Sequence, residues 1–251
     1  TENSGVSPQH QFGQLVNLEV VAPSVATFEL ELDQSITFLA GQYLLLRLPA
    51  MEGYRPYSMT SFSICSQNPT FVIKCVPGGR FSETLFNDKF KAARVDVFGP
   101  MGKATFDPAE ERDLTCMVGG SGIAGIMSIL RQSRDINYFS EHKLTMVFGV
   151  RKPEDFFFLD ELREIQESVP ANINIHLAVS DSSDSNSVPA ELAGLPIWRG
   201  FVHEVAERVM AKDLSGRLGL LGGPPAMLDG SLRLLLSAGV PVHDIRYDKF
   251  G

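Results

Sequence analysis

The strongest constraint on the fold is a change in sequence rhythm close to residue 110. Residues 12–106 hold short runs of strand-forming residues between turn signals, whereas strand-like and helix-like runs alternate from residue 113 onward. The first pattern is typical of a small antiparallel barrel, and the second of a parallel sheet covered by helices on both faces. The charged segment 105–113, which contains Pro108, has the composition of a domain boundary. We therefore expect a β + α/β fold: an antiparallel six-stranded barrel domain over residues 10–108, followed by a Rossmann-like parallel-sheet domain over residues 112–251.

The individual elements follow from propensity and periodicity. In the first part we expect strands over 13–21, 27–32, 42–48, 57–65, 70–76 and 94–98, and a helix over 81–87. In the second part we expect strands over 114–118, 144–150, 173–179, 218–221 and 244–247, with helices over 123–134, 153–168, 202–210 and 225–238. The polar run 181–187 is expected to be a surface loop.

The composition is that of a globular protein that does not bind nucleic acid. Of 251 residues, 44% are hydrophobic and 21% are charged, and the formal net charge is −8. Nucleic-acid binding depends on a surplus of Lys and Arg, which this chain lacks. No apolar run approaches the roughly 20 residues that span a bilayer, so we expect no membrane span.

The three cysteines, Cys65, Cys75 and Cys116, are far apart in apolar, strand-like stretches. We expect them to be buried free thiols in a reducing compartment, which places the protein in the cytoplasm. Their spacing does not match an iron–sulfur cluster. We expect no metal in this chain.

Two clusters in the barrel half match the needs of a flavin nucleotide. They are Arg55-Pro56-Tyr57-Ser58 and Pro77-Gly78-Gly79-Arg80-Phe81-Ser82. An isoalloxazine ring needs a flat face to stack on and a hydrogen-bond partner near its redox-active edge. A diphosphate needs a guanidinium and bare backbone N–H groups. The clusters therefore predict a flavin site, in which case the protein moves electrons.

Two glycine turns in the second half predict a site for a second nucleotide. The first, residues 119–125, contains G-x-G-x-x-G between a strand and a helix, although a tight strand–helix turn also explains such a match. No carboxylate ends the next strand at Phe148-Gly149-Val150-Arg151, which weakens a simple Rossmann interpretation. The second turn, residues 221–227, contains Gly-Gly-Pro-Pro, which also suits a plain turn with Pro opening a helix. Two such turns at one sheet edge define a crevice for a dinucleotide.

The motifs, taken in order, resemble the ferredoxin–NADP reductase superfamily. Within it, the chain is similar to the FAD- and NADH-binding reductase components of bacterial ring-hydroxylating dioxygenases and multicomponent monooxygenases. The blocks that carry this resemblance are GQYLLLRLP (41–49), RPYSMTS (55–61), VPGGRFSETL (76–85), GPMGKATF (99–106), GGSGIAGIMSILR (119–131), FGVRKPEDFFFLDEL (148–162), GGPPAM (222–227) and YDKF (247–250).

The resemblance implies a role for each matching residue. Catalysis would involve Ser58, which hydrogen-bonds near the flavin N5, Tyr57, which stacks on the isoalloxazine, and Phe250, an aromatic over the other flavin face. The flavin site would comprise Arg55, Pro56, Tyr57, Ser58, Ile73, Lys74, Val76, Gly78, Gly79, Arg80, Phe81 and Ser82. The nicotinamide nucleotide would lie on Gly120, Ser121, Gly122, Ile123, Ala124, Gly149, Val150, Arg151, Gly222, Gly223, Pro224, Pro225 and Met227.

The chain departs from the family pattern in three places. Gly222 stands where family members usually have Cys near the nicotinamide, and Gly125 stands where they usually have Pro. The iron–sulfur module that many relatives carry is missing. Either the acceptor is a separate protein or the chain is a fragment of a longer one, and a first residue Thr1 fits both.

The expected activity is electron transfer from NADH through FAD to a one-electron acceptor, such as a [2Fe-2S] ferredoxin or an oxygenase iron–sulfur component. FAD is favoured over FMN because the Gly-Gly-x-x-Ser pattern suits a diphosphate. NADH is favoured because basic residues for a 2′-phosphate are sparse, although Arg151 and Lys152 keep NADPH open. Two alternatives remain: a free flavin reductase, against which PGGRFS and YDKF argue, and a non-catalytic flavin-binding subunit of a larger complex.

Overall fold

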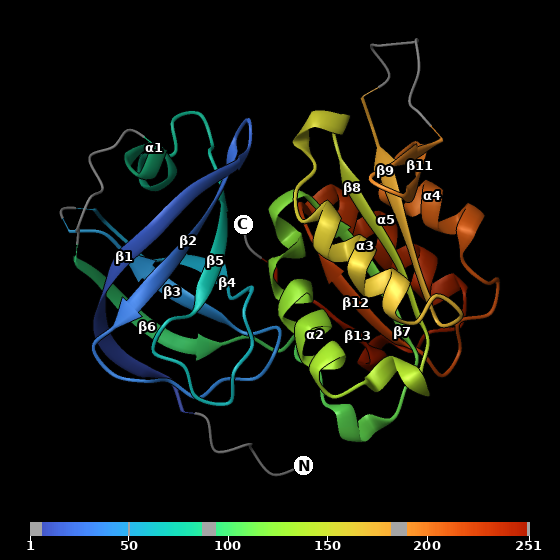
Figure 1. Ribbon diagram of the computed structural model, residues 1–251, viewed down its shortest axis with the longest axis horizontal. Coiled ribbons are helices and arrows are strands. Elements are labelled where there is room, and N and C mark those ends of the chain that lie inside the picture. The colour runs from blue at the N-terminus through green and yellow to red at the C-terminus, as the bar shows by residue number, and fades with distance from the viewer. Residues whose placement is uncertain (1–6, 50, 87–93, 182–189, 250–251) are drawn as a thin grey trace.

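The protein consists of two β-sheet units that lie side by side (Figure 1). The computed structural model describes residues 7–49, 51–86, 94–181 and 190–249. A six-stranded antiparallel sheet occupies the first half and a seven-stranded, mostly parallel sheet the second, so the predicted fold class is confirmed. In the described residues, no helix is long and apolar enough to cross a membrane.

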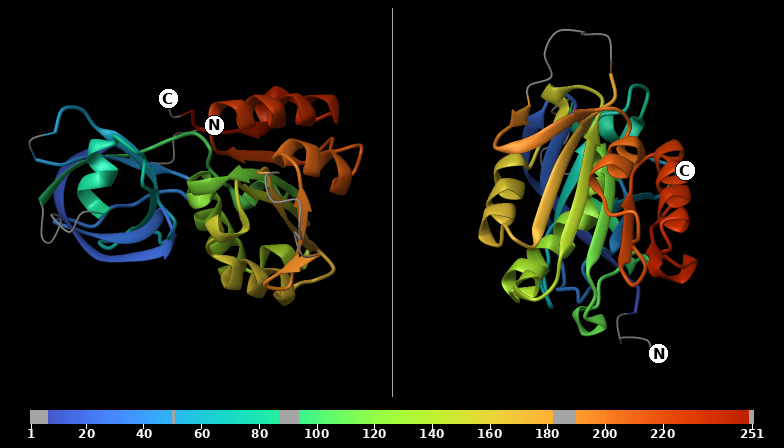
Figure 2. Two further views of the ribbon diagram at one scale, coloured as in Figure 1. Left: turned by 90° about the horizontal axis from the view of Figure 1, so that it is seen from above. Right: turned by 90° about the vertical axis from the view of Figure 1, so that its right-hand side faces the viewer.

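The first sheet curls into a ring, which is visible in the left-hand view of Figure 2. Its strand order is β4-β3-β6-β1-β2-β5. Alternate residues of β2 and β3 are buried, as Phe28, Leu30 and Leu32 are on β2, and their burial drives the sheet to close around an apolar core. The strands are β1 (Gln9–Ala22), β2 (Val25–Leu32), β3 (Tyr43–Arg47), β4 (Arg55–Ser58), β5 (Thr70–Lys74) and β6 (Arg94–Met101), and helix α1 (Arg80–Phe86) covers one end.

The expected strand over 57–65 is wrong beyond Ser58. After Ser58 a single bridge joins Met59 to Phe71, and the chain then leaves the sheet. One backbone hydrogen bond, from Thr60 N to the Thr70 carbonyl, remains at this point, and the Thr60 and Ser61 hydroxyls supply the other bonds to Thr70, so the backbone ladder ends there. The two edge strands β4 and β5 thus meet at the end of the RPYS segment.

The second sheet has the order β10-β11-β9-β8-β7-β12-β13 and carries helices on both faces. Residues of α2 and α3 pack on one face, and residues of α4 and α5 on the other, because both faces of each central strand are apolar. The strands are β7 (Leu114–Gly119), β8 (Leu144–Val150), β9 (Ile173–Val179), β10 (Glu191–Leu192), β11 (Leu195–Arg199), β12 (Leu218–Gly222) and β13 (Ile245–Arg246). The helices are α2 (Ala124–Asp135), α3 (Leu159–Ser168), α4 (Val202–Val209) and α5 (Pro225–Ser237).

Two predictions for this half need correction. The expected helix over 153–168 is a 3-10 turn, Pro153–Asp155, followed by α3, because Phe158 adopts a left-handed backbone that breaks the helix. Strand β11 was missed, since Pro196 and Trp198-Arg199 give it little strand pattern, and its antiparallel pairing with β10 makes the sheet mixed. The predicted loop 181–187 lies outside the described residues except for Asp181.

Helix α2 joins the two units (Figure 1). Its residues Ile126 and Ile129 belong to the same buried cluster as Val25 and Val72 of the barrel. A Cβ on Gly125 would lie 3.2 Å from the Gly41 carbonyl oxygen, so the glycine allows a close approach of the backbones. The apolar core on the α2 face of the second sheet therefore extends across the interface to barrel residues, while the interior of the barrel forms a core of its own.

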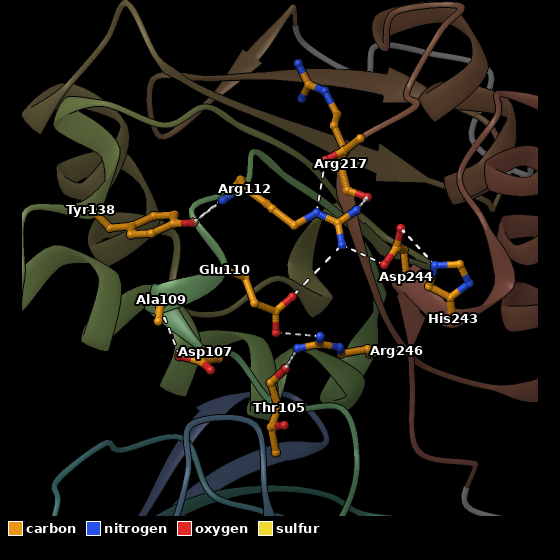
Figure 3. Close-up of polar contacts among 11 residues, drawn as sticks. Thr105, Asp107, Ala109, Glu110, Arg112, Tyr138, Arg217, His243, Asp244 and Arg246 are labelled. Carbon is orange, nitrogen blue, oxygen red and sulfur yellow. Dashed lines mark hydrogen bonds and ion pairs between the residues drawn. The ribbon is translucent and has the colours of Figure 1, made fainter. Parts of the chain in front are cut away.

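The connecting segment 105–113 is fastened by two arginines (Figure 3). Arg112 donates to the carbonyls of Gly216 at 3.0 Å and Arg217 at 2.8 Å, and to Asp244 Oδ1 at 2.6 Å. Arg246 donates to the Thr105 carbonyl at 2.8 Å and to Glu110 Oε1 at 2.6 Å. The connection is therefore a fixed part of the structure and sets how the two sheets are oriented.

We predict that Arg112→Met lowers the free energy of unfolding by roughly 2–4 kcal/mol at pH 7, because Asp244 loses its partner and two carbonyls lose donors. The hydrogen bond from Arg112, opposed by burial, holds the pKa of Asp244 below its ordinary value. That contribution is complete above about pH 4 and is lost as pH falls through the folded-state pKa, so the difference from the parent must shrink in acid. Urea unfolding at pH 7 and at pH 3.5 measures it. Arg233→Met, at an exposed position on α5, is the control, and an effect as large as that of Arg112→Met would contradict the assignment.

Candidate functional site

A cavity of about 970 Å³ lies between the barrel and the second sheet. Strands β4 and β5 line one side, and the carboxyl ends of β7, β8, β9 and β12 line the other. In parallel sheets this edge is where ligands bind, because strand ends and helix starts leave backbone groups free there. The cavity is at the upper end of the usual size of a small-molecule site.

The RPYS segment on β4 forms the barrel wall of the cavity. Arg55 is exposed, its guanidinium donates to the Tyr54 carbonyl at 3.0 Å, and within the described residues no carboxylate lies close enough for an ion pair. Ser58 is half-buried and lines the cavity. This wall offers a free cation and a hydroxyl to a ligand.

The Tyr57 ring is held from behind by aromatic neighbours. Its centroid lies 5.0 Å from that of Phe81 and 6.2 Å from that of Phe28, the latter edge-to-face. Burial raises the pKa of the Tyr57 phenol, opposed by the charge of Arg55, so the phenol is neutral at physiological pH. Phe81, which we expect to be part of the flavin site, packs against Tyr57 and does not line the cavity, so its contact with the flavin stays a prediction.

The turn 76–82 closes on itself. The Ser82 hydroxyl accepts from Val76 N at 3.0 Å and donates to the Gly79 carbonyl at 3.1 Å. Gly78 N donates to Glu83 Oε1 at 2.7 Å. Of this turn, Val76 lines the cavity, whereas Gly78, Gly79, Arg80, Phe81 and Ser82 do not. Direct contact of these five residues with a diphosphate therefore stays a prediction.

The first glycine turn runs from β7 through a 3-10 turn, Gly120–Ile123, into α2. Gly120 has a φ of +53°, which suits glycine, and a Cβ added there would meet no atom within 4 Å, so its surface faces open space. Ile123 is fully buried and anchors the turn instead of lining the cavity. The turn presents a bare backbone to a ligand.

The second glycine turn packs directly against the first. A Cβ on Gly222 would overlap the Gly122 carbonyl oxygen, and a Cβ on Gly122 would overlap the backbone of Gly222 and Gly223. The cysteine that family members usually carry at position 222 therefore has no room in this arrangement. The departure noted in the sequence has a steric cause.

A third part of the cavity is formed by residues that sequence reasoning missed. Phe201 directly precedes α4, is 57% exposed and lies parallel to His203, with an interplanar angle of 7° and ring centroids 6.0 Å apart. Both residues line the cavity, as do Gly149 and Arg151. An exposed aromatic ring beside a glycine-lined strand end offers a surface on which a flat ring can stack. The sequence signal that could have identified Phe201 is the Gly200-Phe201 pair, which directly precedes an expected helix.

The C-terminal segment reaches the cavity through Asp248. Its carboxylate accepts from Lys103 N at 3.0 Å and Ala104 N at 3.4 Å, which ties the tail to the barrel. Burial raises the pKa of Tyr43, and the charge of Asp248 adds to this effect. The YDKF block pointed to this segment, but Phe250, the residue expected to cover the flavin, lies outside the described residues.

The structure brings most of the predicted site residues together. Those that line the one cavity are Arg55, Pro56, Tyr57, Ser58, Ile73, Lys74, Val76, Gly120, Ser121, Gly122, Ala124, Gly149, Val150, Arg151, Gly222, Gly223, Pro224 and Met227. Ile123 and Pro225 do not line it. Lining residues that the sequence did not single out include Ser24, Val72, Asp155, Phe157, Ser180, Phe201, His203 and Asp248.

Comparison with known protein families agrees with this division. Residues 13–106 match the oxidoreductase FAD-binding domain, and residues 117–232 match the oxidoreductase NAD-binding domain. The glycine turns and the RPYS segment lie within these matches. The chain therefore contains an FAD-binding and an NAD-binding oxidoreductase domain.

Named relatives are reductases of oxygenase systems. The chain is 30% identical over 241 residues to ferredoxin–NAD(P)(+) reductase CarAd of Metapseudomonas resinovorans, covering 94% of this chain and 68% of that protein. It is 30% identical over 213 residues to the propane 2-monooxygenase reductase component of Mycolicibacterium goodii, covering 85% of this chain and 59% of the relative. Across four such relatives the chain spans between 55% and 68% of their length.

Solved structures share the fold. The ferredoxin reductase in carbazole 1,9a-dioxygenase superposes with a TM-score of 0.82 at 29% identity, covering 98% of this chain and 71% of that one. The Amycolatopsis cytochrome P450 reductase GcoB has a TM-score of 0.83 at 24% identity, covering 96% of this chain and 69% of that one, which supports the fold alone. On domains, sequence and fold together, the chain belongs to the ferredoxin–NAD(P)(+) reductase family of FAD- and NAD-binding oxidoreductases.

Proposed function

We propose that the protein is a flavin-dependent reductase that passes electrons from NADH through FAD to a one-electron acceptor, such as a [2Fe-2S] ferredoxin or an oxygenase component. The observation that carries the proposal is that one cavity joins the RPYS strand of the FAD-binding domain to both glycine turns of the NAD-binding domain. When bound, FAD accepts two electrons as hydride and can release them singly. The chain supplies binding, orientation and exclusion of water.

The barrel wall fits a flavin nucleotide. Arg55 lines the cavity with a guanidinium that can hold a phosphate in a bidentate manner. Tyr57 is fixed by two rings and is neutral, which suits contact with an uncharged ring system. Ser58 would hydrogen-bond at the redox-active edge. Gly78, Gly79 and Ser82 would hold the flavin diphosphate, on a turn that the Ser82 hydroxyl closes by accepting from Val76 N.

The opposite wall fits a nicotinamide dinucleotide. The exposed backbone of Gly120, ahead of α2, would bind the diphosphate. Phe201 and Arg151, which both line the cavity, would enclose the adenosine end, and Gly223-Pro224 would lie beside the nicotinamide. In this order the reactive ring would lie on the same side as Ser58.

NADH fits better than NADPH. On the side of the cavity assigned to adenosine, Arg151 is a basic lining residue, whereas Lys152 does not line the cavity; Asp155 also lines it, and its carboxylate accepts from Lys152 N at 3.2 Å. A 2′-phosphate would meet a like charge there, which disfavours it.

The remaining assignments rest on these domains. We propose that residues 10–108 form the FAD-binding unit and residues 112–251 the NAD(P)H-binding unit. We propose a separate or fused iron–sulfur protein as acceptor and a cytoplasmic location, in line with the oxygenase systems to which the named relatives belong.

The first prediction tests the activity. The purified protein should keep a yellow flavin through gel filtration, and anaerobic NADH should bleach its visible absorbance. NADH should exceed NADPH by about tenfold or more in kcat/KM. A flavin lost on the column would favour a free flavin reductase. A retained flavin that NADH fails to bleach would favour a non-catalytic flavin subunit.

The second prediction concerns Ser58. Ser58→Ala should lower the limiting rate of flavin reduction by roughly 10- to 100-fold, because a hydrogen bond at the reacting edge is lost while flavin binding through Arg55 is kept. Anaerobic stopped-flow at saturating NADH measures this rate. Ser63→Ala, in an exposed loop where the hydroxyl donates to the Cys65 carbonyl, is the matched control. Equal rates for the Ser58→Ala variant and the parent would remove Ser58 from the mechanism.

The third prediction concerns Gly222. Although family members usually carry cysteine at this position, Gly222→Cys should destabilise this protein by about 1–3 kcal/mol, because the added Cβ overlaps the Gly122 carbonyl oxygen. The same overlap should raise KM for NADH. Gly222→Ala should act in the same direction. Thermal unfolding and steady-state kinetics measure both effects, with Ser237→Cys on the exposed face of α5 as a thiol control. A Gly222→Cys protein as stable as the parent would show that the two turns do not pack this closely.

A further inference from the structure

Helix α2 presents two hydrogen-bond donors to the barrel, one turn apart on the same face. Ser128 Oγ donates to the Ser61 carbonyl at 2.8 Å, and Arg131 Nη1 donates to the Thr60 carbonyl at 2.7 Å. Thr60 and Ser61 follow Ser58 by two and three residues. Helix α2 of the second unit therefore hydrogen-bonds to the chain just beyond Ser58, the residue expected to face the flavin N5.

Contacts within the second unit hold the Arg131 side chain in one orientation. It forms a two-pronged ion pair with Glu161 on α3, at 2.8 and 2.7 Å, and its guanidinium lies 5.6 Å from the centroid of the Phe158 ring. Burial raises the pKa of Glu161, but the hydrogen bond and charge of Arg131, with Arg134, outweigh it and hold that pKa below its ordinary value. Glu161 is therefore charged at neutral pH, and the guanidinium is oriented.

Phe158 connects this ion pair to the cavity. Its φ of +62° is a strained conformation for a bulky residue, and such strain persists where surrounding contacts enforce it. The preceding residue, Phe157, is buried and lines the cavity, as does Asp155. Arg131 thus contacts the segment that forms part of the nucleotide wall.

On the barrel side, Thr60 and Ser61 are also held by hydrogen bonds to β5. Thr60 Oγ1 lies 2.7 Å from Thr70 Oγ1, Thr60 N donates to the Thr70 carbonyl at 2.8 Å, and Ser61 Oγ accepts from Thr70 N at 3.0 Å. A shift of the Thr60 carbonyl would therefore move the end of β4 and the start of β5 together. At its other end, α2 begins directly after the first glycine turn, so it is a rigid link between that turn and the segment after Ser58.

We propose that Arg131, assisted by Ser128, is a positioning residue for hydride transfer: through the Thr60 carbonyl it fixes Ser58 relative to the Gly120–Ile123 turn. This inference rests on the proposed function. A purely structural ion pair would add stability and leave the rate of flavin reduction unchanged. A positioning residue, in contrast, changes the limiting rate more than it changes NADH affinity, because small errors in the placement of reacting atoms are costly.

The test compares Arg131→Met, Arg131→Lys and Ser128→Ala with the control Arg134→Met. Arg134 is on the same helix and 3.8 Å from Glu161 at its nearest approach, and it forms ion pairs with Asp135 and Glu161, which both lie outside the barrel. For Arg131→Met we expect the FAD to be retained, the limiting rate of flavin reduction to fall by about tenfold or more, and the NADH dissociation constant to change by less than about threefold. Arg131→Lys should recover part of the rate, and Ser128→Ala should lose a smaller part.

Hydrogen exchange of the FAD-loaded protein gives a second readout that does not depend on turnover. Peptides covering residues 57–62 should exchange faster in Arg131→Met than in the parent and in Arg134→Met. If Arg131→Met does not fold, Arg131→Lys and Ser128→Ala decide the question by the same two measurements.

Three results would overturn the proposal: a limiting rate within twofold of the parent for a folded Arg131→Met, an equal loss in Arg134→Met, or unchanged exchange in residues 57–62. If NADH fails to reduce even the parent, the proposed function fails, while the exchange measurement still decides whether Arg131 holds the Ser58 segment.

Discussion

The close packing of α2 against the barrel is the constraint on which the rest of the structure depends. Glycine at positions 41 and 125 lets the two backbones approach, and Ile126 and Ile129 share a buried cluster with Val25 and Val72. Burial of these apolar surfaces makes the interface continuous with the core of the second sheet. Because α2 begins at the first glycine turn, this packing also determines where that turn lies relative to β4. The cavity is the space that remains between them.

Polar contacts then fix an orientation that apolar packing alone would leave free to slide, since hydrophobic contacts have little directionality. Arg112 and Arg246 hold the connecting segment on one side, and Asp248 ties the C-terminal segment to the barrel backbone. On the other side, the Arg131–Glu161 pair reaches the Thr60 carbonyl. In each of these contacts, a side chain of the second unit or of segment 105–113 binds a backbone group or a charged side chain of the element that faces it. A site shared by two domains requires such directional contacts, because its reacting groups come from both.

The departures from the family pattern gain a physical explanation from this packing. Gly125 lies where the barrel backbone comes close, and Gly222 lies where the two glycine turns touch. Sequence comparison alone marks both as the loss of a familiar side chain. An added Cβ at Gly222 would overlap the Gly122 carbonyl oxygen, whereas at Gly125 it would lie 3.2 Å from the Gly41 carbonyl oxygen, so a side chain has no room at the first position and only a tight fit at the second.

The sequence by itself determined the two sheet types, the order of the elements and the segments that form the cavity, because strand alternation, helical periodicity and glycine turns are local signals. It located Arg55, Tyr57, Ser58 and both glycine turns from their motifs. It could not place Phe201, His203 or Asp248 in the cavity, and it extended β4 beyond Ser58, because these outcomes depend on partners far away in the chain, such as Thr70 for the exit from β4 and Lys103 for Asp248. It also assigned Ser82 and Phe81 to ligand contact, which stays a prediction; in the structure Ser82 closes its own turn and Phe81 packs against Tyr57. Local sequence fixes what an element is, and contacts between distant segments decide which of its groups remain free to bind.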